Sequence, residues 1–177
     1  MNDYPLISQL KEASDYDKIF NLVKRTVEKT ISRRRAGLSL VLTEIPNHIG
    51  AYFVEGGNNI YMNITILNAM KQLTTTKEEF NSFVYSILTH EYLHSLGYSE
   101  ESVVRPLVKK ICEEHFGPGH ITSTISSHEL YSIYPKLRNL GPGRENNQNF
   151  KVIDNFDKSS MSYICLLYTS PSPRDRG

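Results

Sequence analysis

The sequence lacks three features that mark large classes of protein. No apolar run approaches the ~20 residues that a membrane-spanning helix requires. The first residues do not show the basic and then apolar order of a secretory signal. The formal net charge is only +1, so no overall field attracts nucleic acid or an anionic membrane. Together these absences predict a cytoplasmic protein with no membrane partner.

Cysteine is also scarce, with only Cys112 and Cys165 in the chain. Cys165 opens the segment CLLYTSPSPRD, which resembles the in-frame translation of a sequencing adapter. We interpret residues 165–177 as non-native read-through, expected to be disordered, and residues 1–164 as one domain. Without this tail the net charge becomes zero. The single remaining cysteine cannot form an internal disulfide, which suits a reducing compartment.

The composition, 39% apolar and 22% charged, is typical of a globular chain. Apolar residues spaced by three and four predict helices, and apolar runs between turn residues predict strands. The expected helices cover the region from Ser14 or Asp15 to Arg35 with Gly37 after its end, and residues 65–73, 77–96, 100–116 and, as a short turn or helix, 127–134. The expected strands are 39–45, a hairpin of 50–54 with 59–64, and a final strand near 151–156 after a loop at 139–149. This order predicts an α+β fold.

The helix expected at 77–96 contains the groups most suited to chemistry. Thr76 and Glu79 have capping-box spacing at its start, and Gly97 is placed to end it. His90, Glu91 and His94 continue its apolar stripe, where ionisable groups are expensive to bury without a partner. Two histidines at i and i+4 can both reach one Zn²⁺. The alternative is a trio of hydrogen-bonded histidine and glutamate side chains with no metal.

The motif HEYLHSLG, from His90 to Gly97, resembles that of the zincin metallopeptidases, and its continuation to Glu100 resembles the metzincin pattern. Residues 17–164 also resemble archaeal proteins with an HEYLHSLGY-type core. The resemblance implies a zincin-like fold, with a small, mostly antiparallel sheet packed on the active-site helix. It also implies a zinc peptidase that cleaves a peptide or protein substrate, with Glu91 as the general base toward a metal-bound water. That substrate is expected to lie along an edge strand, 59–64 or 50–54.

The third metal ligand is harder to assign from the motif. Glu100 stands where the metzincin pattern has histidine or aspartate, and we take it as the expected ligand beside His90 and His94. Glu101 is its near substitute, although a glutamate in the first turn of a helix is also ordinary dipole chemistry. His120 is the main long-range alternative, followed by His128. Tyr98 and His120 are candidates to stabilise an oxyanion.

Two other functions compete with a peptidase. The basic residues from Lys24 to Arg35 could bind phosphate, as in a metal-dependent endoribonuclease-like hydrolase. Acidic residues interrupt that run, no aromatic RNA platform accompanies it, and Glu91 is the residue expected of a peptidase, so nucleic acid is not the expected partner. The third hypothesis is a catalytically inactive zincin-like module that binds a partner in its cleft.

Overall fold

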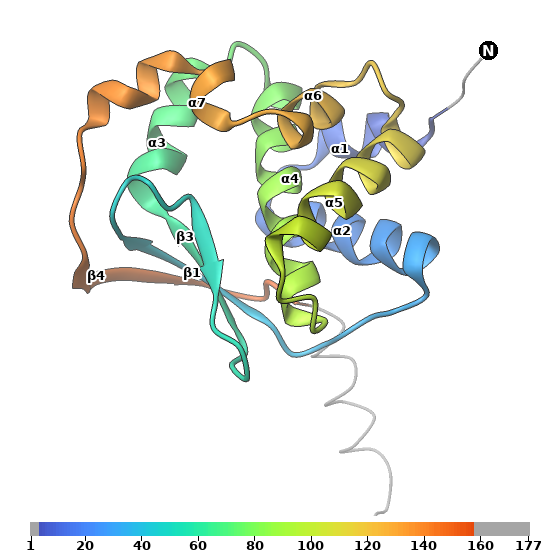
Figure 1. Cartoon of the computed structure of the whole chain (residues 1–177), viewed down its shortest axis with the longest axis horizontal. Helices are drawn as coiled ribbons and strands as arrows, with labels where there is room; N and C mark the ends of the chain where they lie inside the picture. Colours follow the sequence, from blue (N-terminus) through green and yellow to red (C-terminus); the bar gives the residue numbers. More distant parts are fainter. Residues whose placement is uncertain (1–3, 158–177) are drawn as a thin grey trace, which may run out of the picture.

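The computed structural model describes residues 4–157, and the segment interpreted as read-through, 165–177, lies outside them. The described chain is α+β, with a sheet on one side and most of the helices gathered on the other (Figure 1). The helices are α1 Leu6–Glu12, α2 Tyr16–Ile31, α3 Ile64–Leu73, α4 Lys77–Ser95, α5 Glu101–Phe116, α6 Ile121–Ser127, α7 Leu130–Ile133 and the 3-10 helix η1 Pro135–Leu140. The strands are β1 Ser39–Glu44, β2 Ala51–Phe53, β3 Asn59–Asn63 and β4 Asn146–Ile153. Among residues 4–157, no helix is both long and apolar enough to cross a membrane.

The four strands form one mixed sheet in the order β2-β3-β1-β4. The hairpin expected around residues 55–58 is confirmed, since β2 and β3 pair antiparallel. β1 pairs antiparallel with β4, but the central pair, β1 with β3, is parallel. Because β3 has neighbours on both sides, only β2 of the two expected edge strands lies at an edge. Leu40, Leu42, Ile60 and Met62 are buried on the face that meets the core.

Two expected elements are wrong in their bounds. The helix expected from Ser14 or Asp15 begins as predicted, with Asp15 at the N-cap position of α2, but α2 ends at Ile31 instead of continuing toward Gly37. Ser32 takes a left-handed conformation there, and its N–H donates to the carbonyl of Glu28 at 2.8 Å. The second error concerns residues 146–149, expected as loop, which form the start of β4. Their asparagines and glutamine have low strand propensity, and the free edge of β1 supplies the pairing that overrides it.

Helix α4 is the centre of the molecule. Thr76 caps its start as expected, with the Glu79 N–H donating to the Thr76 Oγ1 at 3.1 Å. The helix packs against α1, α2, α5, α6 and the β2–β3 hairpin, so it is covered on most sides. Tyr85, Leu88 and Tyr92 are fully buried in the same core. This packing fixes the helix rigidly, and the groups at its C-terminal end are held with it.

Candidate metal centre

Three side chains converge where α4 ends and α5 begins. The Nε2 atoms of His90 and His94 lie 3.1 and 2.7 Å from one carboxylate oxygen, Oε1 of Glu101. One ligand atom from each of the three residues lies within 4.8 Å of the other two. The histidines occupy successive turns of α4, so their side chains leave the helix in the same direction. We call this His90–His94–Glu101 group the metal centre, as a name for a cluster that could hold a metal ion.

The structure brings Glu101 to the two imidazoles in place of the expected Glu100. Gly97 has φ +103°, which lets the chain reverse directly after α4. Glu100 then precedes α5 in an extended conformation, with its side chain exposed, and Glu101 is the first residue of the helix. Because each helical residue rotates the side chain by about 100°, a shift of one position decides which carboxylate faces α4.

The hydrogen bonds of His94 determine what its Nε2 can do. Its Nδ1 lies 2.8 Å from the carbonyl oxygen of Tyr98, which can only accept, so Nδ1 carries the proton. In the neutral imidazole Nε2 is then an acceptor, and it faces a second acceptor, Oε1 of Glu101, at 2.7 Å. Two acceptors at this distance are satisfied only by a proton or a cation between them. The backbone contact also fixes the orientation of the ring, as is common for metal-ligating histidines.

The pKa directions of His90 and Glu101 favour the forms of these side chains that bind metal. Burial lowers the pKa of His90, which favours the neutral imidazole. Partial burial raises the pKa of Glu101, but hydrogen bonds and charge from His90, with hydrogen bonds from His94 and Arg105, outweigh it and hold the pKa below its ordinary value. A neutral imidazole and an ionised carboxylate are ligands for zinc without further proton loss.

Glu91 lies between the two histidines in the sequence and is almost entirely buried, with 5% of its surface exposed. Burial is the main cause that raises its pKa to about 7, with a smaller contribution from Glu101, while the charge of His94 lowers it. A carboxylate with a pKa near neutral can both take and return a proton at physiological pH. Its remaining exposed surface lines the cleft described next.

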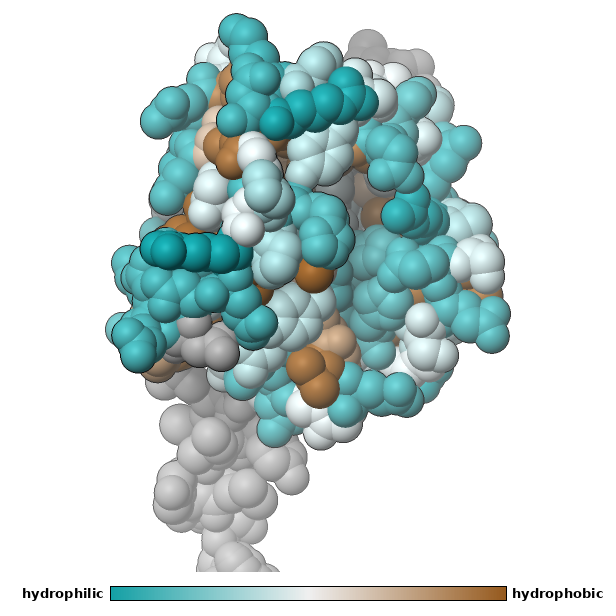
Figure 2. Space-filling view, turned by 60° about the vertical axis from the view of Figure 1, so that its left-hand side comes forward, coloured by the Kyte–Doolittle hydropathy of each residue, from teal (hydrophilic) through white to brown (hydrophobic). Residues whose placement is uncertain are grey.

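A cleft runs past the metal centre between β2 and helices α4 and α5. It consists of two adjoining hollows of about 270 and 420 Å³, both lined by His90 and Glu91. The space-filling view shows this side of the molecule hollowed along its middle (Figure 2). The smaller hollow has an apolar wall of Ile66, Phe83, Ile87, Val108, Ile125 and Leu130. The larger one is bordered by the whole of β2 and by His94 and Glu101.

The long-range candidates from the sequence lie elsewhere or play other parts. His120 is near the opposite end of α4, where it caps α6 and its Nε2 lies 2.9 Å from Oε1 of Glu78. His128 lines the smaller hollow but is not part of the metal centre. Tyr98 contributes its backbone carbonyl to His94, while its ring lies 5.3 Å from the guanidinium of Arg33. Neither Tyr98 nor His120 lines the cleft.

The three consecutive arginines before β1 each contact other residues of the chain. Arg35 donates to the carbonyls of Ser95 and Gly57 at 2.9 and 2.7 Å, which joins the end of α4 to the β2–β3 turn. Arg34 lies 3.9 Å from the Glu28 carboxylate, and Arg33 lies over Tyr98. These contacts do not present the run as one continuous phosphate-binding strip.

Sequence reasoning missed three residues that border the cleft: His48, Arg105 and Tyr131. Arg105 follows Glu101 by four positions, a spacing that predicts an ion pair on a helix and could have drawn attention to it. His48 lies in the loop before β2, which Asn63 holds by donating to the carbonyls of Ile45 and Ile49. Nothing in the sequence near His48 or Tyr131 marks a site, because both reach the cleft only through tertiary packing.

No protein family, curated protein or solved structure matches this chain significantly.

Proposed function

We propose that this protein is a zinc-dependent peptidase with a zincin-like active site, in which His90, His94 and Glu101 hold the metal and Glu91 is the general base. The observation that carries the proposal is the convergence of two Nε2 atoms and one carboxylate oxygen. Their separations of 2.7 and 3.1 Å from Oε1 are close to the ~3.3 Å that tetrahedral ligands at about 2.0–2.1 Å from zinc require. The set of two histidines and one glutamate is also a known catalytic zinc set.

Zinc held by His90, His94 and Glu101 would supply Lewis acidity, which would lower the pKa of water and polarise a carbonyl. The buried carboxylate of Glu91 accepts a proton at its oxygen and later donates it to the leaving amine, the task for which its raised pKa is suited. The apolar surroundings of α4 keep bulk water away from this carboxylate. Each step uses a side chain whose position the rigid helix fixes.

The cleft provides a place for an extended peptide. Within residues 4–157, β2 is an edge strand with a neighbour on one side only, and it borders the larger hollow together with His90, Glu91 and His94. A peptide pairing with its free edge gains backbone hydrogen bonds that do not depend on sequence. The apolar wall of the smaller hollow favours an aliphatic or aromatic side chain next to the bond that is cut.

The test measures metal and activity together. Elemental analysis of the wild type is expected to find about one zinc per chain, which His90→Ala loses and His128→Ala, an exposed histidine outside the metal centre, keeps. Cleavage of a peptide library is then compared between the wild type and Glu91→Gln. Absence of zinc from the reconstituted wild type would contradict the proposal. Zinc without any cleavage would leave a binding module, and cleavage of RNA instead would favour the endoribonuclease-like hypothesis.

A further inference from the structure

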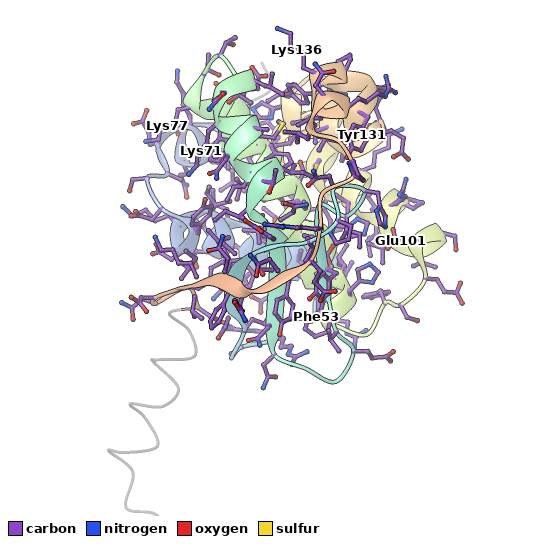
Figure 3. All side chains as sticks on the ribbon, turned by 90° about the vertical axis from the view of Figure 1, so that its left-hand side faces the viewer. Phe53, Lys71, Lys77, Glu101, Tyr131 and Lys136 are labelled. Atoms are coloured by element: carbon purple, nitrogen blue, oxygen red, sulfur yellow. The ribbon has the colours of Figure 1, made fainter. Side chains whose placement is uncertain are left out.

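A chain of ion pairs extends from the metal centre to the rim of the cleft. Arg105 lies one turn after Glu101 on α5, and its Nε lies 3.3 Å from Oε2 of Glu101. The NH1 atom of the same guanidinium lies 2.6 Å from Oε1 of Glu129. Glu129 directly precedes α7, whose Tyr131 donates a hydrogen bond to the carbonyl of Asn47. Figure 3 shows Glu101 on the same side of the molecule as Tyr131 and Phe53.

The two oxygens of Glu101 have different neighbours. Oε1 faces both imidazoles, whereas Oε2 faces Arg105. The carboxylate of a half-exposed glutamate is otherwise free to turn away, because three flexible bonds join it to the backbone. A guanidinium is planar and fixes the direction of its donors, so it can hold one oxygen while the other stays turned toward α4.

We propose that Arg105 is a positioning residue that orients the carboxylate of Glu101 for zinc, and that Glu129 acts through Arg105 by holding its guanidinium. This inference rests on the proposed zinc site. It joins the metal centre to the α6–α7 connection, where His128 and Glu129 line the smaller hollow. The sequence alone gives only the Glu101–Arg105 spacing, since Glu129 is 24 positions further along the chain.

The direction of the change in zinc affinity when Arg105 is replaced distinguishes a positioning role from a purely electrostatic one. Arg105 is a cation close to a site for a cation, so its charge alone repels zinc. If charge were its main influence, a neutral replacement would tighten zinc binding. If it positions Glu101, the same replacement weakens binding, because the free carboxylate must be ordered again when zinc binds.

The experiment measures the zinc dissociation constant of the full chain by competition with a chromophoric chelator. Arg105→Met keeps the aliphatic stem and is expected to weaken binding about tenfold, the lower end of the range for residues that orient metal ligands. Glu129→Gln is expected to have a smaller effect, and the double variant to bind no more weakly than Arg105→Met. Lys109→Met is the matched control, because Lys109 lies one turn further along α5 and pairs with Glu113 at 3.9 Å.

Each outcome decides the point. Arg105→Met binding as tightly as the wild type, or more tightly, would overturn the inference while leaving the zinc site itself intact. Equal weakening by Lys109→Met would also overturn it, since the effect would then belong to the helix as a whole. A wild type that holds no zinc would overturn both this inference and the proposed function. Circular dichroism and urea unfolding of the metal-free variants check that α5 is unchanged.

Discussion

A histidine lies beside a glutamate at each end of α4, but the hydrogen bonding of the two pairs differs. Near the start of the helix, Nε2 of His120 lies 2.9 Å from Oε1 of Glu78. Near its end, Nε2 of His94 lies 2.7 Å from Oε1 of Glu101. Residue types and distances are therefore almost the same. The difference lies in the other nitrogen of each ring.

Nδ1 of His120 accepts a hydrogen bond from the backbone N–H of Thr122, so the proton of the neutral ring is on Nε2 and is donated to Glu78. Nδ1 of His94 donates to the carbonyl of Tyr98, so Nε2 of the neutral ring is an acceptor that faces a second acceptor, Oε1 of Glu101. The first pair is a complete hydrogen bond, and the same ring caps α6 through its Nδ1. The second pair is satisfied only by a proton or a cation between Nε2 and Oε1, and in the proposed function that cation is a zinc ion shared with His90. We therefore expect the partner of the second ring nitrogen to decide whether a histidine–glutamate pair is a structural hydrogen bond or is able to bind a metal.

The largest effect expected from this comparison is on zinc content. His94→Ala is expected to lose the zinc entirely, because a two-ligand site holds the metal weakly. His120→Ala keeps about one zinc per chain, but it removes the cap of α6 and lowers the free energy of unfolding by about 1 kcal/mol. Elemental analysis and urea unfolding measure the two quantities. If the His120 variant lost its zinc while keeping its fold, the expected difference between the His120–Glu78 and His94–Glu101 pairs would be wrong.

The second effect concerns the glutamates. Glu91→Gln is expected to lower the rate of peptide cleavage by about 10²–10⁴, the usual contribution of a general base, with zinc retained. Glu78→Gln, at the other end of α4, is expected to leave the rate within about twofold, because Glu78 pairs with His120, away from the metal centre. Steady-state kinetics on one peptide give both values. A similar loss in both variants would assign the effect to the helix and not to its C-terminal end.

A smaller effect is expected at the turn that brings Glu101 back to α4. Gly97→Ala places a side chain at φ +103° and is expected to cost about 1–2 kcal/mol of stability and to weaken zinc binding. Gly56→Ala, in the hairpin turn with φ +85°, is the matched control. Neither glycine has an atom within 4 Å of where a Cβ would lie, so both costs come from the backbone. Only the Gly97 variant should lose zinc affinity; an equal loss in both would argue against a special role for this turn.

The smallest change on zinc removal is expected in the core between the two ends. The Cys112 thiol is fully buried, and burial raises its pKa to about 12, so it stays protonated at pH 8. In a Cys165→Ser background a disulfide reagent is expected not to react with it, with or without chelator. Above pH 9 the unfolded chain releases this proton while the folded one keeps it, so stability falls as pH rises, by up to ~1.4 kcal/mol per pH unit. Rapid reaction after zinc removal would show that the metal holds the core closed.

Much of the molecule could be predicted from local patterns. The capping pair Thr76 and Glu79, the hairpin turn and the limits of α4 and α5 follow from residues close together in the sequence. The start of β4 at Asn146 could not, because its pairing with Glu44 of β1 joins positions about a hundred residues apart. The predicted end of α2 was wrong because Arg35, expected to close the helix, instead donates to carbonyls of α4 and of the β2–β3 turn.

The sequence by itself determined the pair His90 and His94, since their spacing on a helix places both rings on one side whatever surrounds them. It also determined that the chain turns at Gly97. Only the tertiary structure decided that Glu101 rather than Glu100 faces the rings, that His120 belongs to a cap, and that Arg105 and Glu129 stand behind the metal centre. The physical reason is that the spacing of residues along one helix fixes the relative directions of their side chains. The angle between two helices, by contrast, is set by the packing of the core.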